Sequence, residues 1–228
     1  MIPFLKALLP NRTLPLPILN GPFRGATIYL NPRYSLRKVF GIYEHELNGW
    51  LERVLPRVDT VIDVGANDGY FTFGCAAAFR RLGLSAEIIA FEPLPQHFKE
   101  LKSSLYSQPK DKIQFSLHNC LVGSEVKSGM TTLNAIAHQR NTPKTHENAL
   151  IKIDVEGAEL EVISGASLLL NPTNYFLIEV HDASFLNILT QEFSAHGIKV
   201  GQVNQQALPI IGRERRSEFN WWLVSELL

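Results

Sequence analysis

Along the chain, short apolar runs alternate with longer stretches in which hydrophobic residues recur with helical periodicity. The short runs predict seven strands, at residues 60–64, 86–91, 113–117, 150–154, 175–180, 198–203 and 219–224. Helical spacing predicts helices at residues 70–82, 95–105, 155–170 and 183–195. Strands that alternate with helices favour a doubly wound α/β fold, in which a mostly parallel sheet carries helices on both faces.

The segment before the first of these strands has a different pattern. Residues 1–35 are rich in proline and contain one short alternating run, which predicts an arm with a short strand or hairpin. From Glu44 an apolar stripe with helical spacing predicts a helix that ends at Pro56. We therefore expect an N-terminal extension over residues 1–56 and one α/β domain over residues 57–228.

One long polar stretch interrupts the alternation of strands and helices. Residues 122–148 contain glycine, serine, threonine and asparagine, and they predict a loop with one helical turn near residues 133–136. We find no internal repeat and no linker after residue 57, so this loop is expected to belong to the same domain.

Composition and charge narrow the function classes. The chain has 228 residues, of which 45% are hydrophobic and 19% charged, as in an ordinary globular protein. Its 22 basic and 22 acidic residues leave no net charge, so we expect no nucleic-acid partner. No apolar run reaches the roughly 18–20 residues that cross a bilayer, and Pro3 and Pro10 interrupt the apolar start. We expect a cytoplasmic protein without integral membrane association, and the sequence leaves its oligomeric state open.

The loop after the first strand of the sheet carries two glycines, in the order Asp63-Val64-Gly65-Ala66-Asn67-Asp68-Gly69. Gly65 permits a tight turn and close approach of a ligand to the backbone, and Gly69 lets the next helix begin against the sheet. A dinucleotide-binding fingerprint would need glycine at the positions of Asn67 and Tyr70 as well. The loop therefore favours a cofactor smaller than a dinucleotide.

A carboxylate follows the second strand, in the run Phe91-Glu92-Pro93. Because the carboxyl ends of parallel strands lie at one edge of a sheet, Glu92 is expected near the glycine loop. A carboxylate there can accept hydrogen bonds from both ribose hydroxyls of an adenosine ligand. The pair of signals favours an adenosine-containing cofactor.

Titratable residues also cluster after the fourth and fifth strands. The run from Ile151 to Glu159 places three carboxylates around one glycine, and the run from Ile178 to Asp182 contains a glutamate and a histidine. Ligands of open α/β sheets bind outside these strand ends. Both runs are therefore expected to face the same site as the glycine loop.

Taken together, these motifs resemble the FkbM family of S-adenosylmethionine-dependent methyltransferases. The resemblance is carried, in order and spacing, by residues 61–71, 91–93, 151–159 and 178–181, and residues 41–44 are similar to the family's entry motif. It covers residues 40–182 and implies the Rossmann-like class I methyltransferase fold, with an antiparallel last strand. It also implies methyl transfer to a hydroxyl of a sugar, glycan or natural product. Residues 122–148 depart from the family's pattern, being short and polar.

The resemblance also implies roles for individual residues. The backbone around Gly65, Asn67 and Asp68 would hold the amino-acid part of S-adenosylmethionine, Glu92 the ribose, and Asn119 the adenine. The implied cofactor-binding set is Glu44, Asp63, Gly65, Ala66, Asn67, Asp68, Gly69, Glu92, Pro93, Asn119 and Asp154. The implied catalytic set is His181, Asp154 and Glu156, with His181 facing the acceptor.

A sugar hydroxyl is a poor nucleophile and benefits from a general base. His181, Asp154 and Glu156 are the candidates, while His181 could instead cap neighbouring backbone as a structural residue. A divalent ion held by Asp154, Glu179 and His181 is an alternative, because oxygen and imidazole ligands suit several metals. We nevertheless expect no bound metal.

Two other function classes remain open at this point. A nicotinamide-dependent oxidoreductase could use a similar sheet, although the glycine loop counts against it. A non-catalytic module that binds cofactor or a partner is the second alternative. Stabilisation by S-adenosylhomocysteine or by NAD would separate these classes.

A single lysine stands within the otherwise apolar fourth strand. An unpaired buried charge is costly, so Lys152 needs a partner. Asp63 and Lys152 each lie two residues before the first loop residue of their strands, Gly65 and Asp154. In the sheet that the resemblance implies, these two strands are neighbours. We therefore predict an ion pair between Asp63 and Lys152 beneath the cofactor pocket.

Overall fold

The computed structural model describes residues 9–139, 147–204, 207–209, 212 and 221–226. Its centre is a seven-stranded sheet with the order β10-β11-β9-β8-β3-β4-β5. These strands are β3 (Thr60–Val64), β4 (Ala86–Phe91), β5 (Ile113–His118), β8 (Ala149–Ile153), β9 (Tyr175–Val180), β10 (Val200–Val203) and β11 (Trp221–Ser225). Each apolar run therefore forms a strand, although the sixth begins at Val200 and residues 219–220 lie outside the described part.

The direction of the strands confirms the expected mostly parallel sheet. β3 is parallel to β4 and β8, β4 to β5, and β8 to β9, whereas β11 is antiparallel to β9 and β10. The last strand is thus the antiparallel one. Because β4 and β8 lie on opposite sides of β3, the strand order reverses at β3, and ligands of such sheets bind beside the carboxyl ends at this point.

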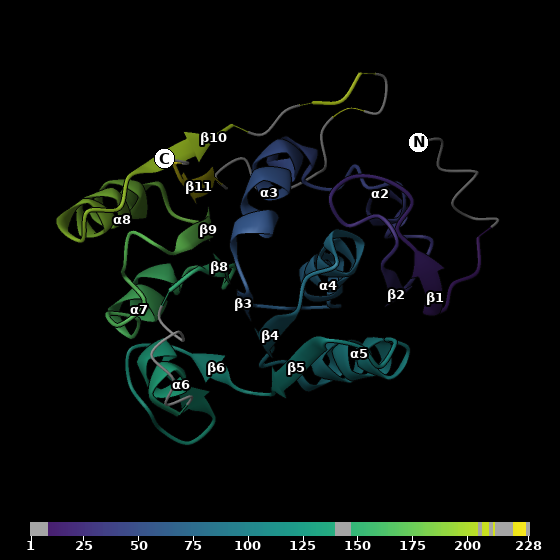
Figure 1. Ribbon diagram of the computed structural model, residues 1–228, viewed down its shortest axis with the longest axis horizontal. Helices are drawn as coiled ribbons and strands as arrows, with labels where there is room; N and C mark the ends of the chain where they lie inside the picture. The colour runs from purple at the N-terminus through teal and green to yellow at the C-terminus, as the bar shows by residue number, and fades with distance from the viewer. Residues whose placement is uncertain (1–8, 140–146, 205–206, 210–211, 213–220, 227–228) are drawn as a thin grey trace.

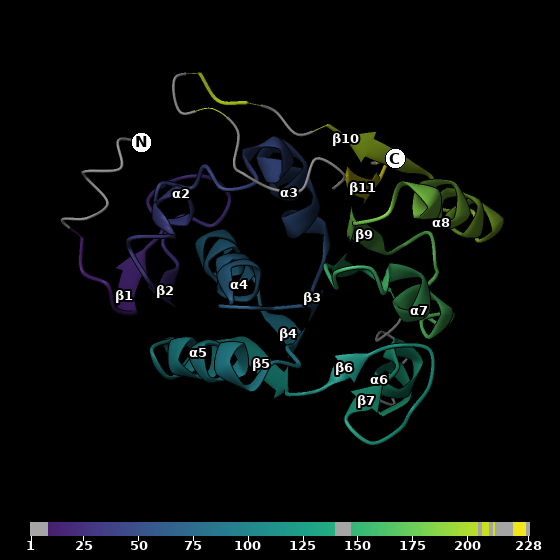
Figure 2. The same ribbon diagram turned by 180° about the vertical axis from the view of Figure 1, so that it is seen from behind.

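Two layers of helices cover the sheet, as Figure 1 and Figure 2 show. One layer holds α3 (Asn48–Val54), α4 (Tyr70–Leu82) and α5 (Pro95–Tyr106), and the other holds α6 (Leu133–Gln139), α7 (Glu159–Ser164) and α8 (Ala183–Ala195). Alternate residues of a strand supply the two cores: Val61 packs in the first layer and Ile62 in the second. Both faces of the central strands are therefore apolar, which explains why these strands read as largely hydrophobic runs.

The N-terminal segment packs into the first of these cores. Strands β1 (Leu14–Pro17) and β2 (Thr27–Leu30) form the expected antiparallel hairpin, followed by the short helix α2 (Leu36–Val39). Phe23, on the hairpin loop, is buried against α4, where a Cβ on Gly74 would lie 2.3 Å from the Phe23 ring. The hairpin and the sheet thus share one hydrophobic core, and the boundary at residue 56 stays a prediction.

The segment from Glu44 forms three short helical pieces instead of one helix. They are the 3₁₀ turns η1 (His45–Leu47) and η2 (Leu55–Arg57) on either side of α3. Pro56 lies within the last turn, where its missing N–H is tolerated, so it does not end the helix as expected.

The polar stretch after β5 contains more regular structure than the sequence indicated. Its short strands β6 (Leu121–Val122) and β7 (Met130–Thr131) pair, and α6 is longer than the single turn that we expected. The reason is burial, since Leu133, Ile136 and Ala137 share one face of α6 and pack in the second core. Conversely, α7 ends at Ser164, short of the expected residue 170. None of the described helices is long and apolar enough to cross a membrane.

Candidate active site

A cavity of about 760 Å³ lies beside the carboxyl ends of β3, β4, β8 and β9. The sequence-predicted site residues that line it are Gly65, Asn67, Glu92, Pro93, Asp154, Glu156 and His181. Within the described part of the chain, the predicted residues that lie outside its lining are Glu44, Asp63, Ala66, Asp68, Gly69 and Asn119. The strand-end motifs therefore meet in one cavity, as expected, while several of their neighbours support it from behind.

Gly65 makes the closest backbone contact of the site. It has φ of 84°, and a Cβ at this position would lie 1.9 Å from the carbonyl oxygen of Asp154. The amide of Asp154 also donates to the carbonyl of Val64 at 3.0 Å. Only glycine combines this φ with this approach, so Gly65 lets the loops after β3 and β8 close against each other.

Glu92 is buried at the end of β4 and joins the loops after β3 and β4. Its Oε2 accepts from the backbone amide of Asn67 at 2.8 Å, and its Oε1 accepts from that of Leu94 at 2.9 Å. Asn67 has φ of 49°, which aims its amide at this carboxylate. Carboxylate oxygens can accept further hydrogen bonds, so Glu92 retains acceptor capacity toward the cavity.

Asn119 braces the loop that carries Glu92. Its side-chain amide donates to the backbone carbonyls of Glu92 at 2.8 Å and Pro93 at 3.0 Å. Asn119 is exposed and does not line the cavity. An adenine contact by its side chain stays a prediction of the resemblance.

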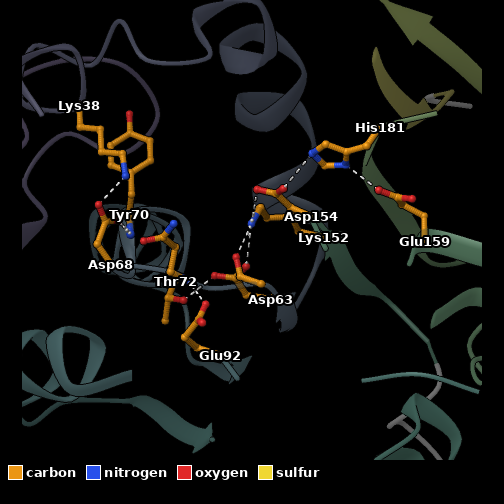
Figure 3. A network of polar contacts seen from close by, with 12 residues as sticks. Lys38, Asp63, Asp68, Tyr70, Thr72, Glu92, Lys152, Asp154, Glu159 and His181 are labelled. Atoms are coloured by element: carbon orange, nitrogen blue, oxygen red, sulfur yellow. Dashed lines mark hydrogen bonds and ion pairs between the residues drawn. The ribbon is translucent and has the colours of Figure 1, made fainter. Parts of the chain in front are cut away.

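Lys152 lies beneath the cavity and forms the predicted ion pair. Its Nζ is 3.2 Å from Oδ1 of Asp63, 3.4 Å from Oδ2 of Asp154 and 3.0 Å from the carbonyl of Gly65 (Figure 3). Asp63 is fully buried and accepts a second hydrogen bond from Oγ1 of Thr72. Burial alone would lower the pKa of Lys152, but the nearby carboxylates, that of Asp63 foremost, raise it above its ordinary value.

His181 is held between two carboxylates at the far side of the cavity. Its Nδ1 is 2.6 Å from Oε1 of Glu159, and its Nε2 is 3.9 Å from Oδ1 of Asp154 (Figure 3). Burial favours the neutral ring, yet the bond to Glu159 and the charges of Glu179 and Asp154 raise the pKa of His181. The bond to His181 in turn lowers the pKa of the Glu159 carboxyl despite its burial.

Sequence reasoning missed Glu159 as a site residue, although it stands within a motif that carries the resemblance. The contact between Glu159 and His181 cannot be read from the sequence, because the two residues are 22 positions apart and meet only in the folded chain. Glu179 was considered from the sequence only as a candidate metal ligand. It is buried on β9 and lines the cavity beside Asp154.

Asp154, Glu179 and His181 also bring ligand atoms within 4.8 Å of one another, a spacing that could hold a metal ion. The ammonium of Lys152 lies 3.4 Å from Asp154 and already supplies a positive charge there. A divalent cation beside it would meet electrostatic repulsion. The absence of a metal at this position stays a prediction from the sequence.

The N-terminal segment contributes to the same region through Lys38 of α2. Its Nζ pairs with Oδ2 of Asp68 at 2.5 Å and lies 5.0 Å from the ring centroid of Tyr43, which lines the cavity. Asp68 also accepts from the amide of Tyr70 at 3.1 Å. The Asp68 side chain therefore fastens the glycine loop to the N-terminal segment.

Comparisons with known proteins support the resemblance. A model of the methyltransferase FkbM domain matches residues 121–199 of the chain. The crystal structure of the methyltransferase FkbM from Methylobacillus flagellatus has a TM-score of 0.54 and 18% identity; the match covers 75% of this chain and 44% of that one. The chain thus spans less than half of that protein.

Two further solved structures are similar at lower scores. A precorrin-6y C5,15-methyltransferase from Geobacter metallireducens has a TM-score of 0.49 at 13% identity, covering 76% of this chain and 85% of its own. An rRNA methylase from Streptococcus thermophilus also has 0.49, at 17% identity, covering 81% and 95%. A comparison with curated proteins finds no significant match.

The fold is therefore that of the class I methyltransferases. The resemblance to the FkbM family is confirmed by the matching domain model and by the similar FkbM structure.

Proposed function

We propose that the chain is an S-adenosylmethionine-dependent methyltransferase that methylates a hydroxyl group of a sugar, glycan or natural product. The observation that carries the proposal is the charge of the cavity. Four carboxylates line it, those of Glu92, Asp154, Glu156 and Glu179. S-adenosylmethionine carries a sulfonium and an ammonium group, so an acidic cavity attracts it.

The residues around the cavity fit such a cofactor. Its volume of about 760 Å³ lies within the range of roughly 300–1,000 Å³ that is usual for small-molecule sites. Glu92 is a buried acceptor at the strand end where ribose hydroxyls would be held, and Gly65 and Asn67 line the cavity beside it, where the amino-acid moiety would lie. This assignment would give Asp154 the side nearest the acceptor.

The same charge argues against the oxidoreductase alternative. A nicotinamide dinucleotide brings a pyrophosphate with two negative charges, which four carboxylates would repel. The backbone amide of Asn67, a donor that could approach a phosphate, is instead occupied by Glu92. A non-catalytic module remains the second alternative, and the pairing of His181 with Glu159 at the cavity favours catalysis over it.

When bound, S-adenosylmethionine would supply an electrophilic methyl group on sulfur, with S-adenosylhomocysteine as the leaving group that keeps the electron pair of the carbon–sulfur bond. The protein's part is to align the acceptor oxygen with that methyl group and to exclude water. His181 accepts the hydroxyl proton at Nε2 as the oxygen forms its bond to carbon. The carboxylates of Glu159 and Asp154 stabilise the imidazolium that results.

Incubating the purified chain with methyl-labelled S-adenosylmethionine and a panel of hydroxyl-bearing glycans and natural products tests this function. We expect label in a methyl ether of at least one acceptor, and none when that hydroxyl is blocked. The turnover of Glu156→Gln is compared with that of His181→Ala, because Glu156 is another candidate base. Label transferred to a nitrogen or carbon atom of the acceptor would contradict O-methylation.

A further inference from the structure

A buried carboxylate stands behind the histidine of the cavity. Glu159 is fully buried at the start of α7. Its Oε1 accepts from the amide of Gly157 at 3.0 Å and lies 2.6 Å from Nδ1 of His181. In the part of the chain that the structure describes, its Oε2 has no hydrogen-bond partner. A buried charge with so few partners is costly unless a cation stands beside it, and His181 is the group placed to become one.

The local sequence explains why the Glu159 side chain reaches the strand end. Glu156 and Gly157 have φ of 53° and 96°, so the chain turns sharply between β8 and α7. This turn brings the amide of Gly157 back to the Glu159 carboxylate and fixes its position. Glu159 belongs to α7 and His181 follows β9, so their contact also ties the two segments together.

The contact determines which ring nitrogen of His181 carries the proton. An ionised carboxylate only accepts hydrogen bonds, so Nδ1 must be the donor to Glu159. In the neutral ring the lone pair is then on Nε2. Figure 3 shows Nε2 on the side of Asp154, 3.9 Å from its Oδ1, at the cavity wall.

We propose that Glu159 is the positioning residue of this site, which holds His181 in the Nδ1-protonated form so that Nε2 can take the proton of the acceptor hydroxyl. The inference rests on the proposed function for the reaction itself. It goes beyond that function by assigning a role to a buried residue that does not line the cavity. Removing the charge of Glu159 would change both the tautomer preference and the proton affinity of His181.

The charges that face His181 come from three elements. They are Glu159 on α7, Glu179 on β9 and Asp154 after β8, the last partly neutralised by Lys152. Glu159 makes the only hydrogen bond to the ring among the described contacts of His181. Its loss should therefore change the ring more than the loss of either other carboxylate.

Nuclear magnetic resonance of the ring nitrogens tests the proposal without cofactor or acceptor. The chain has 7 histidines, and the His181→Gln variant assigns the signal of His181. In the wild type we expect the neutral ring to carry its proton on Nδ1. In Glu159→Gln, which keeps the side-chain shape, the titration midpoint of His181 should move to lower pH.

Glu161→Gln is the matched control, because Glu161 lies two residues further along α7 and is exposed. That variant should leave the His181 titration at its wild-type midpoint. With an accepted substrate, the acid limb of kcat should also move to lower pH in Glu159→Gln, with KM little changed.

A neutral ring protonated on Nε2 in the wild type would overturn the proposal, and this result does not depend on whether Glu159→Gln folds. An unchanged His181 midpoint in a folded Glu159→Gln protein would overturn it as well. Titration of the same sample with S-adenosylhomocysteine separates the two claims. Absent binding there would refute the proposed function, while the tautomer still decides the role of Glu159.

Discussion

Replacing Lys152 with methionine leaves the buried carboxylate of Asp63 without its cation. At 3.2 Å and an effective dielectric constant of about 20, the two charges attract each other by about 5 kcal/mol, part of which offsets the burial of both. Removing one member of a buried pair typically costs about 3–5 kcal/mol, because the other charge stays buried. Asp63 is fully buried, so we expect Lys152→Met to cost that much.

A double-mutant cycle isolates the pair. Asp63→Asn keeps an acceptor for Thr72 and removes the charge, so combining it with Lys152→Met should cost at least about 1 kcal/mol less than the sum of the two single changes. Urea unfolding followed by tryptophan fluorescence measures each free energy, and the slope with urea must stay constant for the comparison to hold. Lys199→Met is the control, since Lys199 is exposed.

Strict additivity of the two substitutions would refute the reasoning. So would a cost of Lys152→Met no larger than that of Lys199→Met. Asp154 also contacts Lys152, with a side chain that is 26% exposed, so it can be hydrated after the substitution. Its contribution to the cost should therefore be smaller than that of Asp63.

Three further predictions concern the cavity. Glu92→Ala should weaken binding of S-adenosylhomocysteine by about 1.5–3 kcal/mol, or about ten- to hundredfold, and an unchanged Kd in calorimetry would remove Glu92 from the ribose role. Gly65→Ala should lower the free energy of unfolding by about 1–3 kcal/mol because of its φ of 84°, and further because the new Cβ clashes with Asp154. Gly83 has φ of 70° and open space around it, so Gly83→Ala should show only the first loss, and equal losses of the two variants in urea unfolding would exclude the clash. His181→Ala should lose about 10²- to 10⁴-fold in kcat while cofactor affinity is retained, and a variant with wild-type turnover would return the histidine to a structural role. Wild-type turnover should rise with pH through a midpoint above that of ordinary histidine, because the neutral ring is the base and the nearby carboxylates raise the pKa of His181.

The hydrophobic pattern was sufficient for the sheet because both of its faces are buried. The central strands β3, β4, β8 and β9 are largely apolar, and the register of β3 and β8 identifies Asp63 as the partner of the buried Lys152. Gly65 was identifiable as well, since a glycine directly after a buried strand indicates a backbone approach. In each case the decisive information lay within one element or between two strands of known order.

The parts that the sequence did not predict depend on tertiary contacts. Leu133 and Ile136 form the buried face of a helix because they pack into the second core, a contact that the local sequence does not show. Glu159 gained its role from a contact between α7 and the end of β9, which no local pattern indicates. The bonds from the side chains of Asp68 to Lys38 and of Asn119 to the loop of Glu92 are likewise tertiary contacts that no local pattern indicates, and the ligand roles expected of these two residues stay predictions.

The central claim is that this acidic cavity binds S-adenosylmethionine, and thermal unfolding with matched ligands tests it most directly. A ligand that binds the folded chain adds RT ln(1 + [L]/Kd), or about 2.7 kcal/mol at a concentration of 100 Kd. We predict that S-adenosylhomocysteine raises Tm in a dose-dependent way, that Glu92→Ala shifts this response to higher concentration, and that NAD leaves Tm unchanged. A rise of Tm with NAD and none with S-adenosylhomocysteine would contradict the account.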